Sequence, residues 1–264
     1  MNLLNKNILR QSDFVQDIYV TQTKVFSSIE YPYLLELITK NNIKSILDVG
    51  TGEGNFISGL AINLPDIEIV AVDGDKKLIH VAKEKNQQKN ITFINQVFDK
   101  NFKNDSYDMI LARFAVEHMT NIEQFISEAV KRLNRSGILV ITEYYCEFVE
   151  EDNEIWKLFR NKEIELYYEL GSKPRSPIII PKEMKKNGLN DVDSIFIHLT
   201  PSTIGHDNFY KIIISYAIGY ANISPKIFTE EIKNKIIDYC IDVQPDNENS
   251  EDRLFLTHSI GIKK

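Results

Sequence analysis

Cysteine is scarce in this sequence: among 264 residues there are two, Cys146 and Cys240, which are far apart and form no Cys-x-x-Cys motif. This excludes a disulfide scaffold and a thiolate zinc site, and it is typical of a reducing compartment. Long hydrophobic runs are also missing, because the longest, Ile212 to Ile223, is interrupted by Gly219 and polar residues and is too short to cross a bilayer. The first residues lack the apolar core of a signal peptide. We therefore expect a soluble, cytoplasmic protein with no membrane partner.

An excess of basic charge is absent as well. Lys and Arg number 31 against 38 Asp and Glu, which gives a net charge of −7, and the basic residues form no cluster. Such a chain has no overall attraction to phosphate backbones or anionic membranes, so nucleic acid is not an expected partner. The apolar fraction of 43% and the charged fraction of 26% are ordinary for a globular protein and exclude a disordered or fibrous one. The length suits one large α/β domain, or one domain with a sizeable appendage.

From Ile43 onward, short apolar runs alternate with amphipathic stretches. The clearest helix begins at Thr120, where Thr120 and Glu123 can form a capping box, and its apolar residues recur at helical spacing as far as Leu133. Strand and helix alternating in this way predict βαβ units, and hence a parallel sheet with helices on both faces. Five strands are predicted in this region, at residues 43–49, 67–73, 91–95, 107–112 and 137–142.

The rest of the chain predicts further elements around this sheet. Helical spacing before residue 41 indicates an N-terminal helical cap, so we divide the chain into a cap at 1–40 and an α/β domain at 41–264. Further helices are predicted at 150–170, 207–221 and 229–240, with a short one closed by Gly188, and further strands at 192–199 and 254–262. The expected fold is α/β, with a doubly wound, mostly parallel sheet of seven strands and helical insertions at about 150–187 and 200–252.

The glycine-rich segment Asp48-Val-Gly-Thr-Gly-Glu-Gly54 is the most informative part of the sequence. It joins an apolar strand to a helix, where glycine lets the chain turn sharply and lets a ligand approach the backbone. The dinucleotide motif G-x-G-x-x-G needs a further glycine at position 55, which is Asn55. Asp73 ends the second strand, 23 residues after Gly50, where a carboxylate can accept hydrogen bonds from ribose hydroxyls. The alternative to a ligand site is a plain, tight strand–helix connection.

The D-x-G-x-G-x-G pattern with this downstream acid resembles motif I of the class I S-adenosylmethionine-dependent methyltransferases. Residues 107–118, with an aromatic-Asp opening and a final His, are similar to the fourth strand of that family and the segment after it. Residues 123–142 resemble its helix, turn and fifth strand, although Ser136-Gly137 replaces the usual glycine pair, and residues 180–188 resemble its short helix before strand six. The resemblance implies a methyltransferase that uses S-adenosylmethionine, has a Rossmann-like fold and occupies residues 41–264.

The resemblance also implies a set of cofactor-binding residues. The family commonly has an Asp just past strand three, near the adenine amine, but here that position is Val97. Either Asp99 reaches the adenine, or Phe98 stacks on it while main-chain groups make the polar contact. Tyr19 and Gln22, on the N-terminal helices, are expected to fold over the cofactor. The complete set of predicted cofactor-binding residues is Asp48, Gly50, Thr51, Gly52, Gly54, Asp73, Gly74, Val97, Phe98, Asp99, Arg113, Tyr19 and Gln22.

Two residues near the end of the fourth strand are candidates for catalysis. His118 could act as a general base, since its titration range suits that role, or it could cap the next helix or bond within the wall. Arg113 could bind the methionine carboxylate of the cofactor or an acidic substrate, or it could pair with an acid such as Glu117.

The segments after the fourth and fifth strands narrow the substrate class. Tyr144, Tyr145 and Trp156 could line a substrate pocket, or they could belong to the core. Residues 112–115 read Ala-Arg-Phe-Ala, without the Asp-Pro-Pro-Tyr type of segment found in methyltransferases that act on base amines. Arg113 stands where a metal-dependent enzyme would need clustered acids, so no metal is expected. We therefore predict methyl transfer to an O, N or C atom of a small, partly apolar metabolite.

Two other functions stay open at this point. A non-catalytic S-adenosylmethionine-binding protein, or the partner subunit of an enzyme, could keep the glycine turn and Asp73 without turnover. A NAD-dependent oxidoreductase shares the fold type but conflicts with Asn55. The sequence is also compatible with a homodimer.

Overall fold

The computed structural model describes residues 17–102, 105–145, 153–243 and 252–264, with side chains from Gln22 onward. Cys146 and the acidic stretch around Asp246 therefore lie outside the described residues. The chain divides into two compact units. We call the first the sheet unit, formed by Ser27–Tyr144, Arg175–Ile197 and Leu256–Lys264. We call the second the helical unit, formed by the described parts of Met1–Phe26, Tyr145–Pro174 and His198–Phe255.

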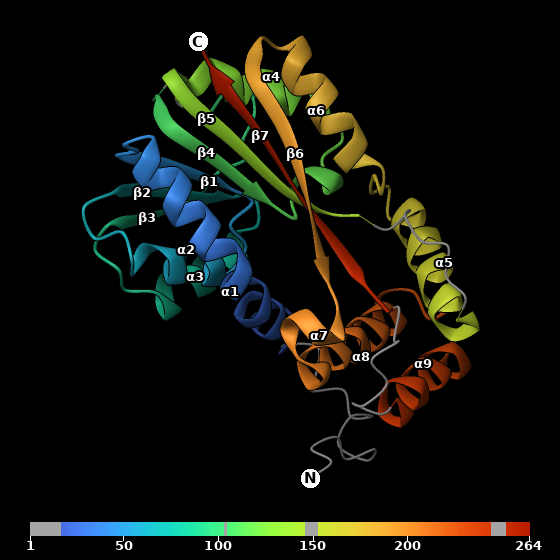
Figure 1. Ribbon diagram of the computed structural model, residues 1–264. Coiled ribbons are helices and arrows are strands. Elements are labelled where there is room, and N and C mark those ends of the chain that lie inside the picture. The colour runs from blue at the N-terminus through green and yellow to red at the C-terminus, as the bar shows by residue number, and fades with distance from the viewer. Residues whose placement is uncertain (1–16, 103–104, 146–152, 244–251) are drawn as a thin grey trace. The chain divides into compact units, whose positions relative to one another are not determined.

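The sheet has seven strands in the order β3-β2-β1-β4-β5-β7-β6 (Figure 1). Neighbouring pairs from β3 to β5 are parallel, and β7 pairs antiparallel with β5, so that Tyr144 lies opposite Leu256. The predicted doubly wound, mostly parallel sheet is thereby confirmed. The strands are β1 (Ser45–Val49), β2 (Glu68–Asp73), β3 (Ile91–Asn95), β4 (Tyr107–Arg113), β5 (Leu133–Tyr144), β6 (Leu189–Leu199) and β7 (Leu254–Lys263).

Helices cover both faces of the sheet because successive strand residues point to opposite sides and both sides are apolar. Ile46 packs with α1 (Asp17–Lys40), α2 (Asn55–Ala61) and α3 (Lys76–Lys85) on one face. The next residue, Leu47, packs with α4 (Ile122–Arg132) and α6 (Ser176–Lys186) on the other face. The N-terminal helical prediction corresponds to the single helix α1 within the described residues, with Pro32 inside it.

The start of α4 differs from the sequence prediction. Its N-cap is Asn121, whose side chain accepts a hydrogen bond of 2.9 Å from the backbone N–H of Gln124. The prediction that Thr120 and Glu123 form a capping box is therefore wrong, because the cap lies one residue later, at Asn121. Asn caps a helix at least as well as Thr, and Glu123 instead pairs with Lys186.

The helical unit contains α5 (Glu154–Glu169), α7 (Pro201–Ile204), α8 (His206–Ile223) and α9 (Glu230–Asp242). Three of these confirm predicted helices, with shifted ends, whereas the four-residue α7 was not predicted. Trp156 packs against Phe159 and Phe209, with ring centroids 5.4 and 5.7 Å apart. This unit is thus built on an aromatic core of its own. Among the described residues, no helix combines the length and the apolar character that crossing a membrane requires.

Candidate functional site

The turn between β1 and α2 uses glycine for different reasons at different positions. Gly50 and Gly52 have φ angles of 77° and 57°, in the left-handed region that other residues avoid. A Cβ atom on Gly50 would lie 2.5 Å from the Cβ of Ala115, and one on Gly54 would lie 2.6 Å from the Phe93 ring. A Cβ atom on Gly52 would meet nothing within 4 Å. Gly50 and Gly54 therefore serve packing, whereas Gly52 borders open space.

Asp73, at the end of β2, is tied to this turn. Its Oδ2 accepts a hydrogen bond of 2.9 Å from the Gly52 N–H, and its Oδ1 accepts one of 2.8 Å from the Asp75 N–H. A carboxylate has about four acceptor positions, so two remain for a ligand. Gly74 follows directly, and a Cβ atom there would lie 3.2 Å from Val97. The turn thus presents a fixed anionic group beside the open space at Gly52.

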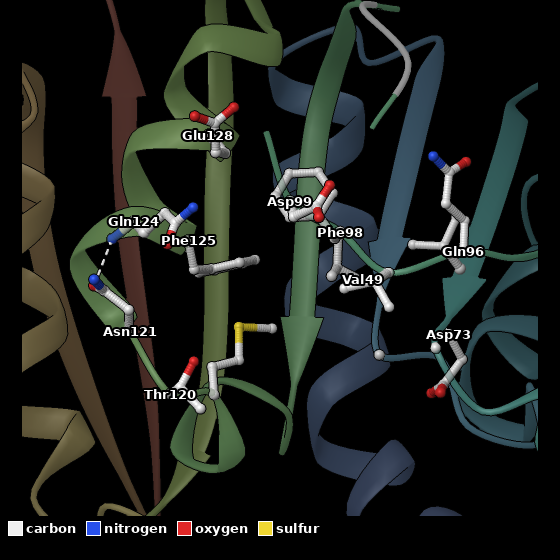
Figure 2. A pocket seen from close by; sticks show the side chains of 15 residues that line it. Val49, Asp73, Gln96, Phe98, Asp99, Thr120, Asn121, Gln124, Phe125 and Glu128 are labelled. Carbon is white, nitrogen blue, oxygen red and sulfur yellow. Dashed lines mark hydrogen bonds between the residues drawn. The ribbon is translucent and has the colours of Figure 1, made fainter. Parts of the chain in front are cut away.

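A cavity of about 310 Å³ lies beyond the carboxyl ends of β1 and β2 (Figure 2). Figure 2 shows Asp73 on one side and Thr120 and Asn121 on the other, with Phe98 between them. The Phe98 ring is held by Phe102 and Phe125, with centroid distances of 5.1 and 5.5 Å. The lining consists of Val49, Gly50, Val72, Asp73, Gly74, Gln96, Val97, Phe98, Asp99, Met119, Thr120, Asn121, Gln124, Phe125 and Glu128.

The structure thus brings six predicted cofactor residues to one cavity: Gly50, Asp73, Gly74, Val97, Phe98 and Asp99. Sequence reasoning missed Gln96, Asn121 and Gln124, which supply its amide groups. Their only signal in the sequence is that they follow the third and fourth strands, whose carboxyl ends meet at this edge of the sheet.

Asp48 lies in the interior next to the turn rather than on the cavity wall. It is 4% exposed, and burial raises the pKa of its carboxyl group to about 6. Thr51, the other predicted residue of the turn, donates its backbone N–H to Val72 O over 3.0 Å and so ties the turn to β2. Their contacts with a cofactor stay predictions.

Arg113, the last residue of β4, is fixed by a buried partner. Its Nε lies 3.0 and 2.9 Å from the two carboxylate oxygens of Glu30, and its Nη2 lies 2.8 Å from one of them. Its guanidinium also lies over the rings of Phe56 and Phe114, at 4.3 and 4.2 Å. The alternative that Arg113 pairs with an acid is therefore confirmed, with Glu30 as the partner in place of Glu117.

Glu30 comes from α1 and is fully buried. Although burial alone would raise the pKa of this carboxyl group, the charge of Arg113 and the neighbouring His258 side chain hold it below its usual value. His258 Nε2 lies 3.5 Å from Glu30 Oε1. No sequence signal linked these three residues, because Glu30 and Arg113 are 83 positions apart.

His118 ends the short 3-10 turn η2 (Val116–His118), which follows β4. Its side chain is 55% exposed, and its Nε2 lies 3.4 Å from Glu117 Oε1. Partial burial lowers the pKa of the imidazole below its usual value. The imidazole is therefore mostly neutral at pH 7 and able to accept a proton. Its neighbours Met119 and Thr120 line the cavity.

Several predicted residues belong to the helical unit instead. The Tyr19 side chain lies outside the described residues. Gln22 donates a hydrogen bond of 2.8 Å to the Tyr216 hydroxyl. Tyr145 and Trp156 are 2% and 1% exposed. Their contacts with a cofactor or substrate stay predictions.

Tyr144, by contrast, is the last residue of β5 in the sheet unit, where it is 3% exposed. Its contact with a substrate also stays a prediction. Within the described part of the chain, no three His, Cys, Asp or Glu side chains are grouped so that they could hold a metal ion.

Part of this chain is similar to known proteins. The family described as "Methyltransferase domain" matches residues 47–141. Malonyl-[acyl-carrier protein] O-methyltransferase of Bacillus cereus is 24% identical over 153 residues, which are 56% of this chain and 57% of that protein. Ubiquinone biosynthesis O-methyltransferase of Rickettsia prowazekii is 30% identical over 121 residues, which are 43% of this chain and 47% of that protein.

A solved structure agrees on the fold. Phosphoethanolamine N-methyltransferase 2 of Haemonchus contortus, in complex with phosphomonomethylethanolamine and S-adenosylhomocysteine, has a TM-score of 0.54 at 16% identity, covering 83% of this chain and 48% of that one. The chain spans about half the length of the curated relatives it matches. The glycine turn, Asp73 and the cavity all lie within or beside the matched residues. The segment that carries the glycine turn and Asp73 thus matches a methyltransferase domain, and the named relatives are methyltransferases.

Proposed function

We propose that this protein transfers a methyl group from S-adenosylmethionine to an O, N or C atom of a small, partly apolar metabolite. One observation carries the proposal: the Asp73 carboxylate is held by the Gly52 N–H beside open space at Gly52, next to a cavity of about 310 Å³. This arrangement lies in the segment that matches methyltransferase domains.

The residues of the turn and cavity suit the parts of this cofactor. The two remaining acceptor positions of Asp73 fit the two hydroxyls of a ribose. The missing Cβ at Gly52 leaves room for a ligand to approach the backbone. Val97 and Phe98 offer apolar contact for adenine, while Gln96 and Asp99 offer polar contact at its edge. We keep as proposed cofactor-binding residues Tyr19, Gln22, Asp48, Thr51 and Gly54.

S-adenosylmethionine supplies an electrophilic methyl group on a sulfonium. The protein then has to align the acceptor and exclude water, and it needs a base only where the acceptor atom must lose a proton. We propose His118 as that base, since its lowered pKa keeps the imidazole neutral at pH 7. Arg113 is proposed as a fixed positive charge for the cofactor carboxylate or an acidic substrate, since Glu30 and two rings restrain it.

The named relatives leave the accepting atom open. Two are O-methyltransferases and one is an N-methyltransferase, and their names give different substrates. The bound phosphomonomethylethanolamine in the last supports a small-molecule acceptor. Tyr144, Tyr145 and Trp156 are kept as proposed substrate contacts. A cytoplasmic location and a homodimer stay predictions, which cell fractionation and light scattering would test.

Titration calorimetry with S-adenosylmethionine, S-adenosylhomocysteine and NADH tests the cofactor directly. We expect saturable micromolar binding of the first two and none of NADH. Binding of NADH alone would contradict the proposal and favour an oxidoreductase. An assay for S-adenosylhomocysteine release over a panel of small acceptors then tests turnover. Cofactor binding without release on any acceptor would favour a non-catalytic binding protein or partner subunit.

A further inference from the structure

Glu143 is a buried carboxyl group that the proposed chemistry does not yet use. It is the penultimate residue of β5 and is fully buried. Its Oε1 accepts hydrogen bonds from the backbone N–H groups of Val116, at 2.7 Å, and Glu117, at 3.3 Å. Its Oε2 has no hydrogen-bond partner among the residues that the structure describes. A buried polar atom of this kind is costly, so its retention calls for a reason.

The two N–H groups belong to the turn that follows β4. That turn starts with Phe114, whose φ angle of 51° is unusual for a bulky residue, and whose N–H donates to Thr142 O over 2.8 Å. Ala115 comes next, and it occupies the space that a Cβ on Gly50 would fill. The turn therefore packs against the glycine turn and leads to His118. β5 fixes it twice, through a backbone carbonyl and through the Glu143 side chain.

Glu143 can accept from both N–H groups even when its carboxyl group is neutral. Burial raises the pKa of Glu143 to about 8, although its backbone hydrogen bonds and the charge of Arg113 act in the opposite direction. Arg113 is itself committed to Glu30, so it gives Glu143 no direct ion pair among the described contacts. A neutral carboxyl group still has an acceptor oxygen for both amides. A glutamine side chain has an equivalent oxygen, whereas alanine and methionine have none.

We propose that Glu143 is a positioning residue, which holds the turn after β4 so that His118 stays beside the cavity-lining residue Met119 and Ala115 stays against Gly50. Its relevance to methyl transfer rests on the proposed function. The effect of Glu143 on the turn does not depend on the proposed function, and it can be measured without turnover. Glu143 acts through Val116 and Glu117, and not by contact with reacting atoms.

The test compares Glu143→Gln, Glu143→Ala and Glu143→Met in the full chain. Amide hydrogen exchange of Val116 and Glu117 and the NMR titration of the His118 imidazole, assigned with a His118→Gln variant, report on the turn. We expect Glu143→Gln to keep both close to wild type. We expect Glu143→Ala and Glu143→Met to raise amide exchange at least tenfold and to shift the His118 pKa. Thr142→Val is the matched control, a change of similar size on the neighbouring buried residue, and should leave both unchanged.

Two results would overturn the proposal: wild-type exchange and His118 titration in both Glu143→Ala and Glu143→Met, or a change in Glu143→Gln as large as theirs. If Glu143→Ala does not fold, Glu143→Met and Glu143→Gln decide the matter. With a working acceptor, we expect Glu143→Met to lower kcat at least tenfold with KM for S-adenosylmethionine within threefold, and Glu143→Gln to restore kcat. Failure of wild type to bind S-adenosylmethionine would reject the proposed function while the exchange and titration data still decide the role of Glu143.

Discussion

At the scale of single residues, the glycine turn separates two reasons for leaving out a side chain. Gly50 and Gly54 make room for Ala115 and Phe93, whereas Gly52 makes room for nothing in the described part of the protein. All three have positive φ angles, so the backbone conformation does not distinguish them. The atoms that a Cβ would meet do distinguish them, because Gly52 alone of the three borders open space, where we propose that a ligand binds.

Gly52→Val should therefore abolish micromolar binding of S-adenosylmethionine, lowering affinity at least a hundredfold. A second glycine offers a matched control: Gly171 has a φ angle of 72°, and a Cβ atom there would also meet nothing within 4 Å. Gly171→Val should carry a similar strain of about 1–2 kcal/mol in the free energy of unfolding and leave affinity unchanged. Calorimetry and urea unfolding measure the two quantities. Equal affinity losses in both variants would mean that strain, and not a ligand, explains the effect.

Gly50→Ala should destabilise the fold, because the new Cβ would lie 2.5 Å from the Cβ of Ala115. The double variant Gly50→Ala/Ala115→Gly removes that clash and keeps only the strain of the positive φ angle. We expect the double variant to recover at least about 1 kcal/mol of the loss, measured as the coupling free energy in urea unfolding. A coupling energy near zero would show that the two residues do not press on each other.

How much of the site the sequence could predict depends on how local each contact is. Asp48, the glycines and Asp73 fall in one strand–turn–helix–strand segment, so their meeting follows from the βαβ connection alone. Glu30, Glu143 and His258 come from α1, β5 and β7, and the fold brings them to partners that are distant along the chain. Spacing along the chain carries no record of such partners.

At the scale of elements, the presence of a helix or strand was easier to predict than the residues at which it begins and ends. Periodicity identifies α4, but the choice between Thr120 and Asn121 as its cap depends on local backbone angles that neighbouring residues settle together. The strands likewise followed from apolar runs, while their order in the sheet, with β7 between β5 and β6, came from packing. No local sequence pattern predicts that β7 lies between β5 and β6.

The cap of α4 can be tested by removing each candidate. Asn121→Ala should lower the free energy of unfolding by about 1 kcal/mol, because it removes the acceptor for the Gln124 N–H. Thr120→Ala should cost clearly less, within about 0.5 kcal/mol of wild type, since Thr120 lies outside the cap and is exposed. Chemical unfolding without ligand gives both values. The reverse ranking would restore the capping box predicted from the sequence.

At the scale of the whole molecule, the buried acids make stability depend on pH. Burial raises the pKa of Glu143 from its ordinary 4.5 to about 8. The stabilisation that its neutral form brings is complete below the unfolded pKa and is lost as the pH rises through the folded one. Burial also raises the pKa of Asp48, to about 6. Its effect on the free energy of unfolding is the same in wild type and in every variant that keeps Asp48.

Glu143→Gln isolates this effect, because glutamine does not titrate. Relative to the variant, wild type should lose unfolding free energy steadily as the pH rises across the window from 4.5 to about 8. Urea unfolding of both proteins at several pH values gives the difference, and any constant penalty from the amide cancels in its slope. A difference that does not vary with pH would mean that Glu143 titrates normally in the folded protein.

The position of β7 has a consequence for how the protein is made. A ribosome produces β5, then β6, and only afterwards β7, yet β7 lies between the other two in the finished sheet. While β7 is still being synthesised, β5 and β6 both have an unpaired edge that another strand could occupy. Pairing of β5 with β6 in a nascent chain would have to be undone before β7 could enter. Assembly of this half of the sheet is therefore a late step, and the nascent chain passes through a stage in which it is open to pairing with its neighbours on a polysome.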